Sequence, residues 1–201
     1  EVRPHILILD DGFQHFRLKR DLDIVLVNSL NPFGNYSLIP SGSLREPLSS
    51  LKRADIFVIT KSNLADEVIS LKDFLRKINP SSLIACSAHL FKGLYEFGNE
   101  KEIDISALRD KNIGAICDIG DPDSFEKLLK KEGFKIKISL RFLDHHIFDI
   151  GEIKDSIGRC LAQRIDTIIT TEKDIFRLRD FLGVFSGAGI RLVFVKMELA
   201  L

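Results

Sequence analysis

Residues 6–15 read Ile-Leu-Ile-Leu-Asp-Asp-Gly-Phe-Gln-His, an apolar run that passes directly into two carboxylates, a glycine, an amide and an imidazole. Four consecutive apolar residues before a turn signal are typical of a buried strand, so we expect a strand over residues 5–10. A carboxylate at the end of such a strand is held rigidly, and Mg2+ prefers one or two such oxygens together with water and substrate phosphates. The stretch therefore favours a metal-binding sheet edge, although Asp10 and Asp11 could equally begin a turn that Gly12 completes.

The rest of the chain alternates between strand-like and helix-like segments. We expect strands at residues 23–28, 55–60, 83–87, 113–117, 135–140, 166–170 and 191–195, and helices at 64–78, 122–132, 150–164 and 173–182. This alternation is typical of α/β proteins whose mainly parallel strands are joined by crossover helices. The turn residues at 79–82 predict a domain boundary there, which gives domains at 1–80 and 83–201.

The composition excludes several classes of protein. The 29 Lys and Arg residues balance the 29 Asp and Glu residues, so the chain lacks the basic excess of a nucleic-acid binder. The three cysteines have no metal-ligand spacing, and their odd number argues against a disulfide framework: Cys86, Cys117 and Cys160. We therefore interpret them as reduced thiols in a cytosolic protein. No apolar run approaches the ~20 residues of a membrane-spanning helix. The first residue is Glu, which suggests that the chain is a fragment.

A long loop is expected over residues 31–47, because this stretch is rich in Pro and Gly and poor in helix formers. Long loops inside compact domains are more often functional than idle. Near the end of the loop, Arg45 and Glu46 could form an exposed ion pair of little energetic weight. Alternatively, Arg45 could bind a phosphate while Glu46 orients it, since a guanidinium matches phosphate geometry.

Two further polar clusters follow expected strands. Asp144-His145-His146 could be a carboxylate-oriented base, a metal site or a surface turn. The run from Thr170 to Asp174 lies at a strand-to-helix turn, where backbone N–H groups and Lys173 could bind an anion. In the simpler interpretation, the threonines only cap the helix and Lys173 is solvated.

Taken together, these motifs resemble the tetraacyldisaccharide 4'-kinases, the lipid A 4'-kinases of Gram-negative bacteria. The resemblance rests on residues 10–15, 20–21, 33–34, 38–40, 42–47, 51–55, 119–125, 142–146 and 171–174, which occur in the family's order at compatible spacings. It implies the C-terminal two-thirds of such an enzyme. Residues 1–80, with a substrate loop at 31–47, would be the remainder of a P-loop kinase core, and residues 83–201 a smaller Rossmann-like domain.

The resemblance also implies an activity and a set of site residues. The activity is transfer of a phosphoryl group from ATP, with Mg2+, to the 4'-hydroxyl of a tetraacylated glucosamine disaccharide 1-phosphate, a lipid A precursor. The implied roles are metal binding by Asp10 and Asp11, catalysis by Asp11 and His145, nucleotide binding by Asp10, Gln14, Glu46 and Lys173, and substrate binding by Ser43 and Arg45. Phosphoryl transfer of this kind relies on positioning and charge neutralisation. The implied location is peripheral, on the cytoplasmic face of the inner membrane, through an N-terminal part that this chain lacks.

Three departures from the family pattern qualify the resemblance. Leu143 stands where the family usually has Pro, and Asp118 stands where it usually has a small residue, so that an acid pointing toward the site could repel phosphate. No GxxxxGK[ST] motif occurs, although this motif supplies the backbone cradle and Lys for the β- and γ-phosphates. We therefore expect ~a hundred or more residues ahead of Glu1 in the intact enzyme. On its own, the 201-residue chain should be inactive.

Three other readings compete with the kinase. A phosphatase with an aspartyl nucleophile needs a second Asp two positions after the first, where this chain has Gly12. A manganese phosphoesterase of the Asp-His-His type matches residues 144–146 but also needs an N-terminal His-x-x-x-Asp-x-Asp, and His5 stands at the wrong spacing from Asp10. The third reading is a non-catalytic module that binds a lipid headgroup or Mg2+ weakly.

Overall fold

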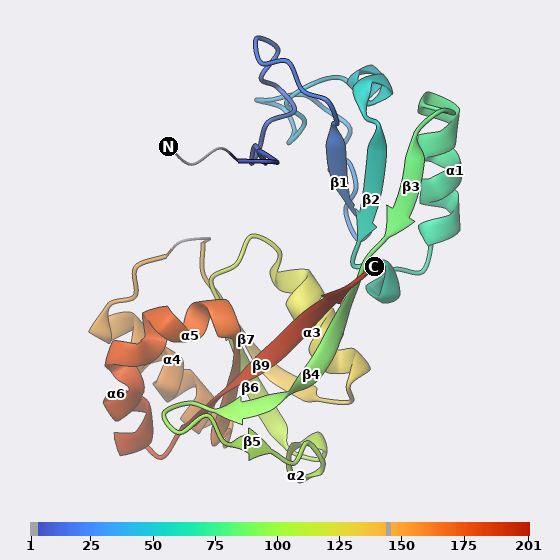
Figure 1. Ribbon diagram of the computed structural model, residues 1–201. Coiled ribbons are helices and arrows are strands. Elements are labelled where there is room, and N and C mark those ends of the chain that lie inside the picture. Colours follow the sequence, from blue (N-terminus) through green and yellow to red (C-terminus); the bar gives the residue numbers. More distant parts are fainter. Residues whose placement is uncertain (1–3, 144–145) are drawn as a thin grey trace. The chain divides into compact units, whose positions relative to one another are not determined.

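The computed structural model describes residues 4–143 and 146–201, which fall into two compact units (Figure 1). The first unit, Glu1–Ala88 with Leu201, contains β1 (Ile24–Asn28), η1 (Leu48–Arg53), β2 (Ile56–Thr60), η2 (Ser62–Leu64), α1 (Val68–Ile78) and β3 (Leu83–Cys86). The second unit, His89–Ala200, contains β4 (Ala88–Glu96), β5 (Glu102–Ile103), α2 (Ser106–Arg109), β6 (Asn112–Cys117), α3 (Pro122–Lys131), β7 (Lys135–Arg141), α4 (Ile150–Ala162), β8 (Thr167–Thr171), α5 (Glu172–Leu178), η3 (Arg179–Phe181), α6 (Leu182–Gly187) and β9 (Arg191–Ala200). The predicted α/β class is confirmed.

The first unit is built on a parallel sheet of order β1-β2-β3. Alternate side chains of these strands, such as Val27 and Phe57, pack with Leu71 and Leu75 of α1 in one core cluster. Because β3 pairs with β2, it belongs to this first sheet. The boundary expected at residues 79–82 therefore falls one strand too early, since the turn there is an ordinary connection between α1 and β3.

The opposite face of this sheet is apolar and uncovered in the part of the chain that the structure describes. Ile24 and Leu26 of β1 are 52% and 68% exposed, and Leu83 of β3 is 69% exposed. Side chains alternate between the two faces of a strand, so these residues point away from α1. Parallel sheets are ordinarily covered on both faces.

The strand expected at residues 5–10 is wrong. Residues 6–9 have no regular secondary structure, and Ile6, Leu7 and Ile8 are 80%, 86% and 92% exposed. The apolar pattern is that of a strand, but a strand forms only where a neighbour satisfies its backbone N–H and C=O groups. Within the described residues, the first sheet ends at β1, whose ladder runs to β2.

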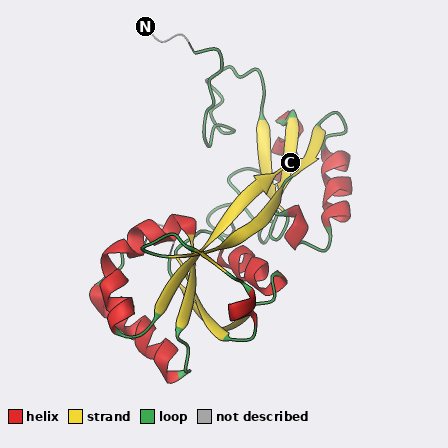
Figure 2. Cartoon of the chain, turned by 60° about the horizontal axis from the view of Figure 1, so that its bottom comes forward, coloured by secondary structure: helices red, strands yellow, loops and turns green. Residues whose placement is uncertain are grey.

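The second unit is built on a six-stranded sheet of order β5-β4-β9-β8-β6-β7, in which β7, β6, β8 and β9 run parallel. Figure 2 shows helices on both sides of these strands. One face packs against α3 through Phe125 and Leu129, and the other packs against α4, α5 and α6 through residues such as Ile157 and Phe185. β8 is consequently buried along its whole length, and β6 is buried after its first residue, Asn112.

The strand order reverses at β6. The chain passes from β6 through α3 to β7 on one side, and from β7 through α4 to β8 on the other side. In open α/β sheets, ligands bind outside the carboxyl ends of the strands at such a switch point. Asp118 directly follows β6 and Thr171 ends β8, so both lie at this edge.

Several element boundaries differ from those expected. The helix predicted at 64–78 begins only at Val68, because the chain first makes the short η2 turn. The helix predicted at 173–182 is divided into α5 and α6 by the 3-10 turn η3. Both β4 and β5 escaped prediction, and the antiparallel β4–β5 pair adds an edge to an otherwise largely parallel sheet.

Candidate functional site

The two neighbouring acids lie in an exposed turn ahead of β1. Asp11 has a φ of 54°, in the left-handed region that few non-glycine residues adopt, and Gly12 follows it. We call residues 10–16 the acid turn. Arg45 Nη1 donates a hydrogen bond to Asp11 Oδ2 over 2.6 Å. The structure thus brings a predicted metal ligand and a predicted substrate residue into direct contact, although they are 34 positions apart.

Arg45 is presented by a loop with its own hydrogen bonds, residues 31–47, which we call the long loop. Leu44 N donates to Ser37 O, and Ile39 N donates to Leu44 O, so the chain folds back on itself within the loop. Gly42 makes this possible, because a Cβ there would lie 2.2 Å from the carbonyl oxygen of Ser37. Ser43, the other predicted substrate residue, is exposed beside it.

Glu46 connects the long loop to the acid turn. Its carboxylate accepts hydrogen bonds from Arg53 Nη2 at 3.0 and 2.9 Å. Partial burial opposes ionisation, but hydrogen bonds from Ser50, Arg53 and Gln14 hold the pKa of Glu46 below its usual value. Two of the three predicted nucleotide residues of this unit, Gln14 and Glu46, therefore contact each other. Sequence spacing assigns no role to Arg53 or Ser50, because it does not show that η1 folds back onto the loop.

Arg53 also touches the acid turn directly. Its guanidinium carbon lies 4.5 Å from the ring centroid of Phe13 and 4.9 Å from that of Phe16. A cation at this distance is attracted to the face of an aromatic ring. Arg53 thus contacts both the acid turn and the long loop.

In the second unit, the run from Thr170 to Asp174 forms the turn between β8 and α5. The predicted cap is confirmed at Thr171, whose hydroxyl accepts a hydrogen bond from Asp174 N over 3.2 Å. Lys173 is exposed in the first turn of this helix. Its position agrees with either interpretation of the sequence, an anion contact or a solvated side chain.

Asp118 stands where a small residue was expected from the family pattern. It is fully buried and forms an ion pair with Arg177 of α5. Its backbone N–H donates to Asp174 Oδ2 over 3.2 Å. Burial and the neighbouring Asp118 raise the pKa of Asp174 to about 7. Asp118 is therefore neutralised inside the unit by a residue 59 positions away, which no sequence spacing indicated.

Among the described residues, three buried oxygens at this place have no hydrogen-bond partner: Asp118 Oδ1, Thr170 Oγ1 and Asp174 Oδ1. Asp118 and Thr170 follow Ile116 and Ile168 at two-residue intervals, and those isoleucines face the cluster that contains α5. The carboxyl ends of β6 and β8 thus carry a polar group under α5. The Oδ2 atom of each acid accepts a hydrogen bond, whereas the Oδ1 atom of each has no partner among the described residues.

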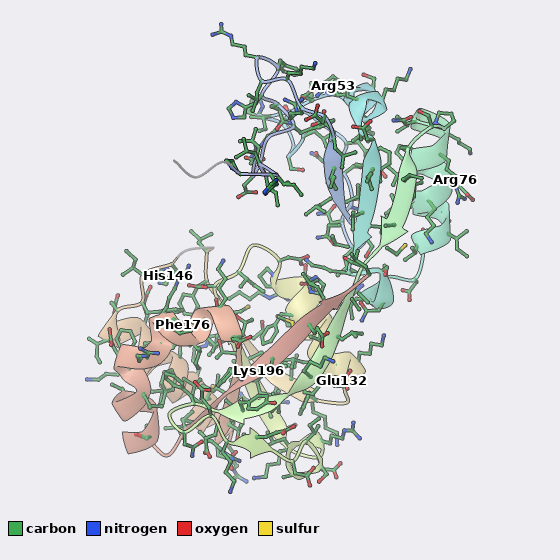
Figure 3. All side chains as sticks on the ribbon, in the orientation of Figure 1. Arg53, Arg76, Glu132, His146, Phe176 and Lys196 are labelled. Atoms are coloured by element: carbon green, nitrogen blue, oxygen red, sulfur yellow. The ribbon has the colours of Figure 1, made fainter. Side chains whose placement is uncertain are left out.

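The Asp-His-His motif is only partly described. Asp144 and His145, the predicted catalytic histidine, lie outside the described residues. His146 Nε2 lies 2.8 Å from Glu152 Oε2, and its ring stacks on Phe142 with centroids 4.9 Å apart (Figure 3). Glu152 also accepts from Asp149 N in the capping box of α4. Hydrogen bonds from His146 and Asp149 N lower the pKa of Glu152. His146 therefore supports a helix start.

Among the described residues, no three or more His, Cys, Asp or Glu side chains come together in a way that could hold a metal ion. No helix in the described ranges has the length and apolar content needed to cross a bilayer.

Comparison with known proteins decides the family. The family model described as tetraacyldisaccharide-1-P 4'-kinase matches residues 1–201. The chain belongs to this family. The resemblance inferred from the ordered motifs is therefore confirmed for the whole chain.

Curated proteins named tetraacyldisaccharide 4'-kinase agree with the family assignment. One from Halothermothrix orenii is 37% identical over 98% of this chain and 54% of its own length. One from Elusimicrobium minutum is 37% identical over 87% of this chain and 46% of its own length. A probable mitochondrial tetraacyldisaccharide 4'-kinase of Arabidopsis thaliana is 36% identical over 96% and 51%. The chain thus spans about half the length of these kinases, rather than two-thirds.

A crystal structure agrees with the fold of this kinase-family chain. It is an "apo" form of LpxK from Aquifex aeolicus in complex with ATP, similar to this chain with a TM-score of 0.52 and 24% identity. The match covers 94% of this chain and 51% of the crystallised one.

Proposed function

We propose that the chain forms part of a tetraacyldisaccharide 4'-kinase, which transfers a phosphoryl group from ATP to the 4'-hydroxyl of a tetraacyldisaccharide 1-phosphate. The observation that carries the proposal is the contact of Arg45 with Asp11, because it joins an acid turn suited to a metal with a loop suited to a phosphate. Membership of the family and the names of the relatives support the same reaction. The ATP in the LpxK crystal from Aquifex aeolicus supports ATP as the donor.

The residues of the acid turn fit Mg2+. Asp10 and Asp11 are adjacent and exposed, so their carboxylates are accessible to an ion. Carboxylate oxygens that leave room for water and phosphate oxygens are the donors this ion prefers. Bound there, Mg2+ would neutralise charge on the transferring phosphoryl group. Asp10 and Asp11 would hold it, and Asp11 would take part in catalysis.

The remaining roles follow from position and chemistry. Gln14 and Glu46 would bind the nucleotide, and Ser43 and Arg45 the lipid substrate, from the acid turn and the long loop. Lys173, exposed in the first turn of α5, would contribute a positive charge to the nucleotide site. His145, whose structure is not described, would be the catalytic histidine. These residues would position the reacting groups and neutralise their charge, which is most of what phosphoryl transfer requires of a protein.

The P-loop would come from a further part of the whole enzyme. Three observations support this: the chain spans about half the length of its relatives, contains no GxxxxGK[ST], and leaves an apolar sheet face uncovered among the described residues. The same further part would attach the enzyme to the cytoplasmic face of the inner membrane. The substrate is a lipid, so a peripheral membrane position suits it.

The experiment is a phosphoryl-transfer assay with γ-labelled ATP, Mg2+ and tetraacyldisaccharide 1-phosphate. The intact enzyme should label the lipid, and Asp11→Asn should lower kcat about 100-fold or more, the scale for losing one preorganised charge contact. The 201-residue chain alone should show no transfer. Unchanged turnover in Asp11→Asn would overturn the site assignment. Manganese-dependent phosphodiesterase activity without ATP would instead favour the Asp-His-His phosphoesterase.

A further inference from the structure

Arg53 is the last residue of η1 and reaches two segments that precede it (Figure 3). Its Nη2 donates to both carboxylate oxygens of Glu46, which belongs to the long loop. Its guanidinium plane lies near the rings of Phe13 and Phe16, which belong to the acid turn. Arg53 therefore binds the two halves of the candidate site to each other.

The Glu46 carboxylate is where these contacts converge. It receives hydrogen bonds from Arg53, Ser50 and Gln14, which come from η1 and from the acid turn. The Glu46 side chain is only 18% exposed, so the ionised group depends on these donors in place of water. Loss of Arg53 would remove a charged donor and leave the partly buried Glu46 carboxylate with the neutral donors Ser50 and Gln14.

The contact of Arg53 with two aromatic rings also restrains the acid turn. Phe13 packs on the core of the first unit, whereas Phe16 is 66% exposed, and Arg53 lies against both rings. Phe13 and Gln14 follow Asp11 by two and three positions, so their placement determines where the acids lie. Three backbone hydrogen bonds, from His15, Phe16 and Leu18, form the turn beyond them.

An ordinary surface ion pair would look different. Arg76 and Asp73 on α1 form one at 3.4 Å, with side chains 63% and 58% exposed, and join residues three positions apart (Figure 3). Such a pair contributes little to stability. Arg53 instead connects three segments through a partly buried acid and two rings.

We propose that Arg53 is a positioning residue of the phosphoryl-transfer site. It holds Glu46 and the acid turn at a fixed separation, and so sets where Asp11 meets Arg45. This inference rests on the proposed function. A planar guanidinium is required, because a Lys ammonium is a compact point charge that cannot bind the carboxylate and cover two rings at once.

The first test needs no activity. In the intact enzyme, amide hydrogen exchange across residues 12–18 should become about tenfold faster in Arg53→Ala and in Arg53→Lys, because local opening of the turn loses its restraint. Arg76→Ala should leave this exchange unchanged. Equal exchange in Arg53→Ala and wild type would overturn the proposal, whether or not the enzyme is a kinase.

The second test is turnover. Arg53→Lys should lower kcat about 10- to 100-fold, the scale for displacing a reacting group by a fraction of an ångström to one ångström, with the thermal midpoint unchanged. Added guanidinium should restore part of the activity of Arg53→Ala, and ammonium should not. Full turnover in Arg53→Lys, even with faster exchange, would reduce Arg53 to a structural role and overturn the proposal. A wild-type enzyme without kinase activity would refute the proposed function, while the exchange experiment still decides whether Arg53 fixes the acid turn.

Discussion

Arg45 Nη1 lies 2.6 Å from Asp11 Oδ2, so the proposed substrate arginine contacts the proposed metal ligand. Both side chains are more than half exposed. An arginine and a metal ion compete for the same carboxylate oxygens. The contact therefore engages one of the two Asp11 oxygens that a cation could use.

Replacing Arg45 should strengthen metal binding. In the absence of nucleotide, Arg45→Ala should raise the affinity for Mn2+, used as a paramagnetic substitute for Mg2+, by about two- to fivefold, the range that an exposed ion pair allows. Arg45→Lys keeps the competing charge and is the matched control. Broadening of the Asp10 and Asp11 resonances measures the affinity. An affinity that falls in Arg45→Ala would mean that Arg45 organises the acids instead of competing for them.

Gly42 should be required for the shape of the long loop. A Cβ at this position would lie 2.2 Å from backbone oxygen Ser37 O, so Gly42→Ala must displace the strand-like return that presents Ser43 and Arg45. We expect KM for the lipid to rise about tenfold, because one misplaced contact costs that much in binding. Gly158→Ala is the control. Apart from its chain neighbours and the backbone of α4 itself, no atom of the described residues lies within 4 Å of a Cβ there, and alanine in α4 should stabilise the fold by up to about 1 kcal/mol. Unchanged KM in Gly42→Ala would show that the loop rearranges freely.

Much of the fold follows from local pattern, because the signals are local. Asp121 and Pro122 predict the start of α3, and the structure confirms both the cap and the proline in the first turn. The expected strand at residues 5–10 fails for the opposite reason. Whether an apolar run becomes a strand depends on a neighbouring strand, and no property of Ile6 or Leu7 reports one.

The candidate site, like the fold, is only partly predictable from the sequence. Residue types and order pointed to Asp11, Glu46 and Arg45, because phosphoryl transfer needs carboxylates and cations that a sequence displays openly. The residues that hold them were not visible. In the sequence, Arg53 resembles any other surface arginine, because its role depends on η1 folding onto the acid turn. The sequence likewise allows Asp118 to repel phosphate, whereas in the fold Arg177 pairs with it.

Asp174 should make the second unit less stable as pH rises. Burial and Asp118 raise the pKa of Asp174 to about 7, whereas an unfolded Asp titrates near 4. The folded state therefore keeps a proton that the unfolded chain releases, so this stabilisation is complete below about pH 4 and is lost as pH rises through about 7.

Asp174→Asn isolates this effect. Asparagine resembles the protonated acid, since it can donate to the Asp118 carboxylate and still accept from Asp118 N. The free energy of unfolding of the variant, minus that of the wild type, should increase between pH 4 and 7 and then level off. Amide exchange of β8 measures it, and Asp180→Asn, which removes an exposed acid from η3, is the control. A difference in unfolding free energy that does not change with pH would contradict a protonated Asp174 in the folded state.

Alanine substitutions of the two neighbouring histidines should have different effects on kcat. His146 stacks on Phe142 and bonds to Glu152, so its imidazole is occupied with the start of α4. His146→Ala should keep kcat within about threefold of wild type while loosening the helix start, as loss of a capping contact does. His145→Ala should lower kcat about 100-fold or more, the scale for a general acid–base group. Steady-state kinetics of the intact enzyme, with amide exchange of residues 149–153, distinguishes them. If His146→Ala lost as much activity as His145→Ala, the contact with Glu152 would have to open during the reaction, and the motif would act as a pair.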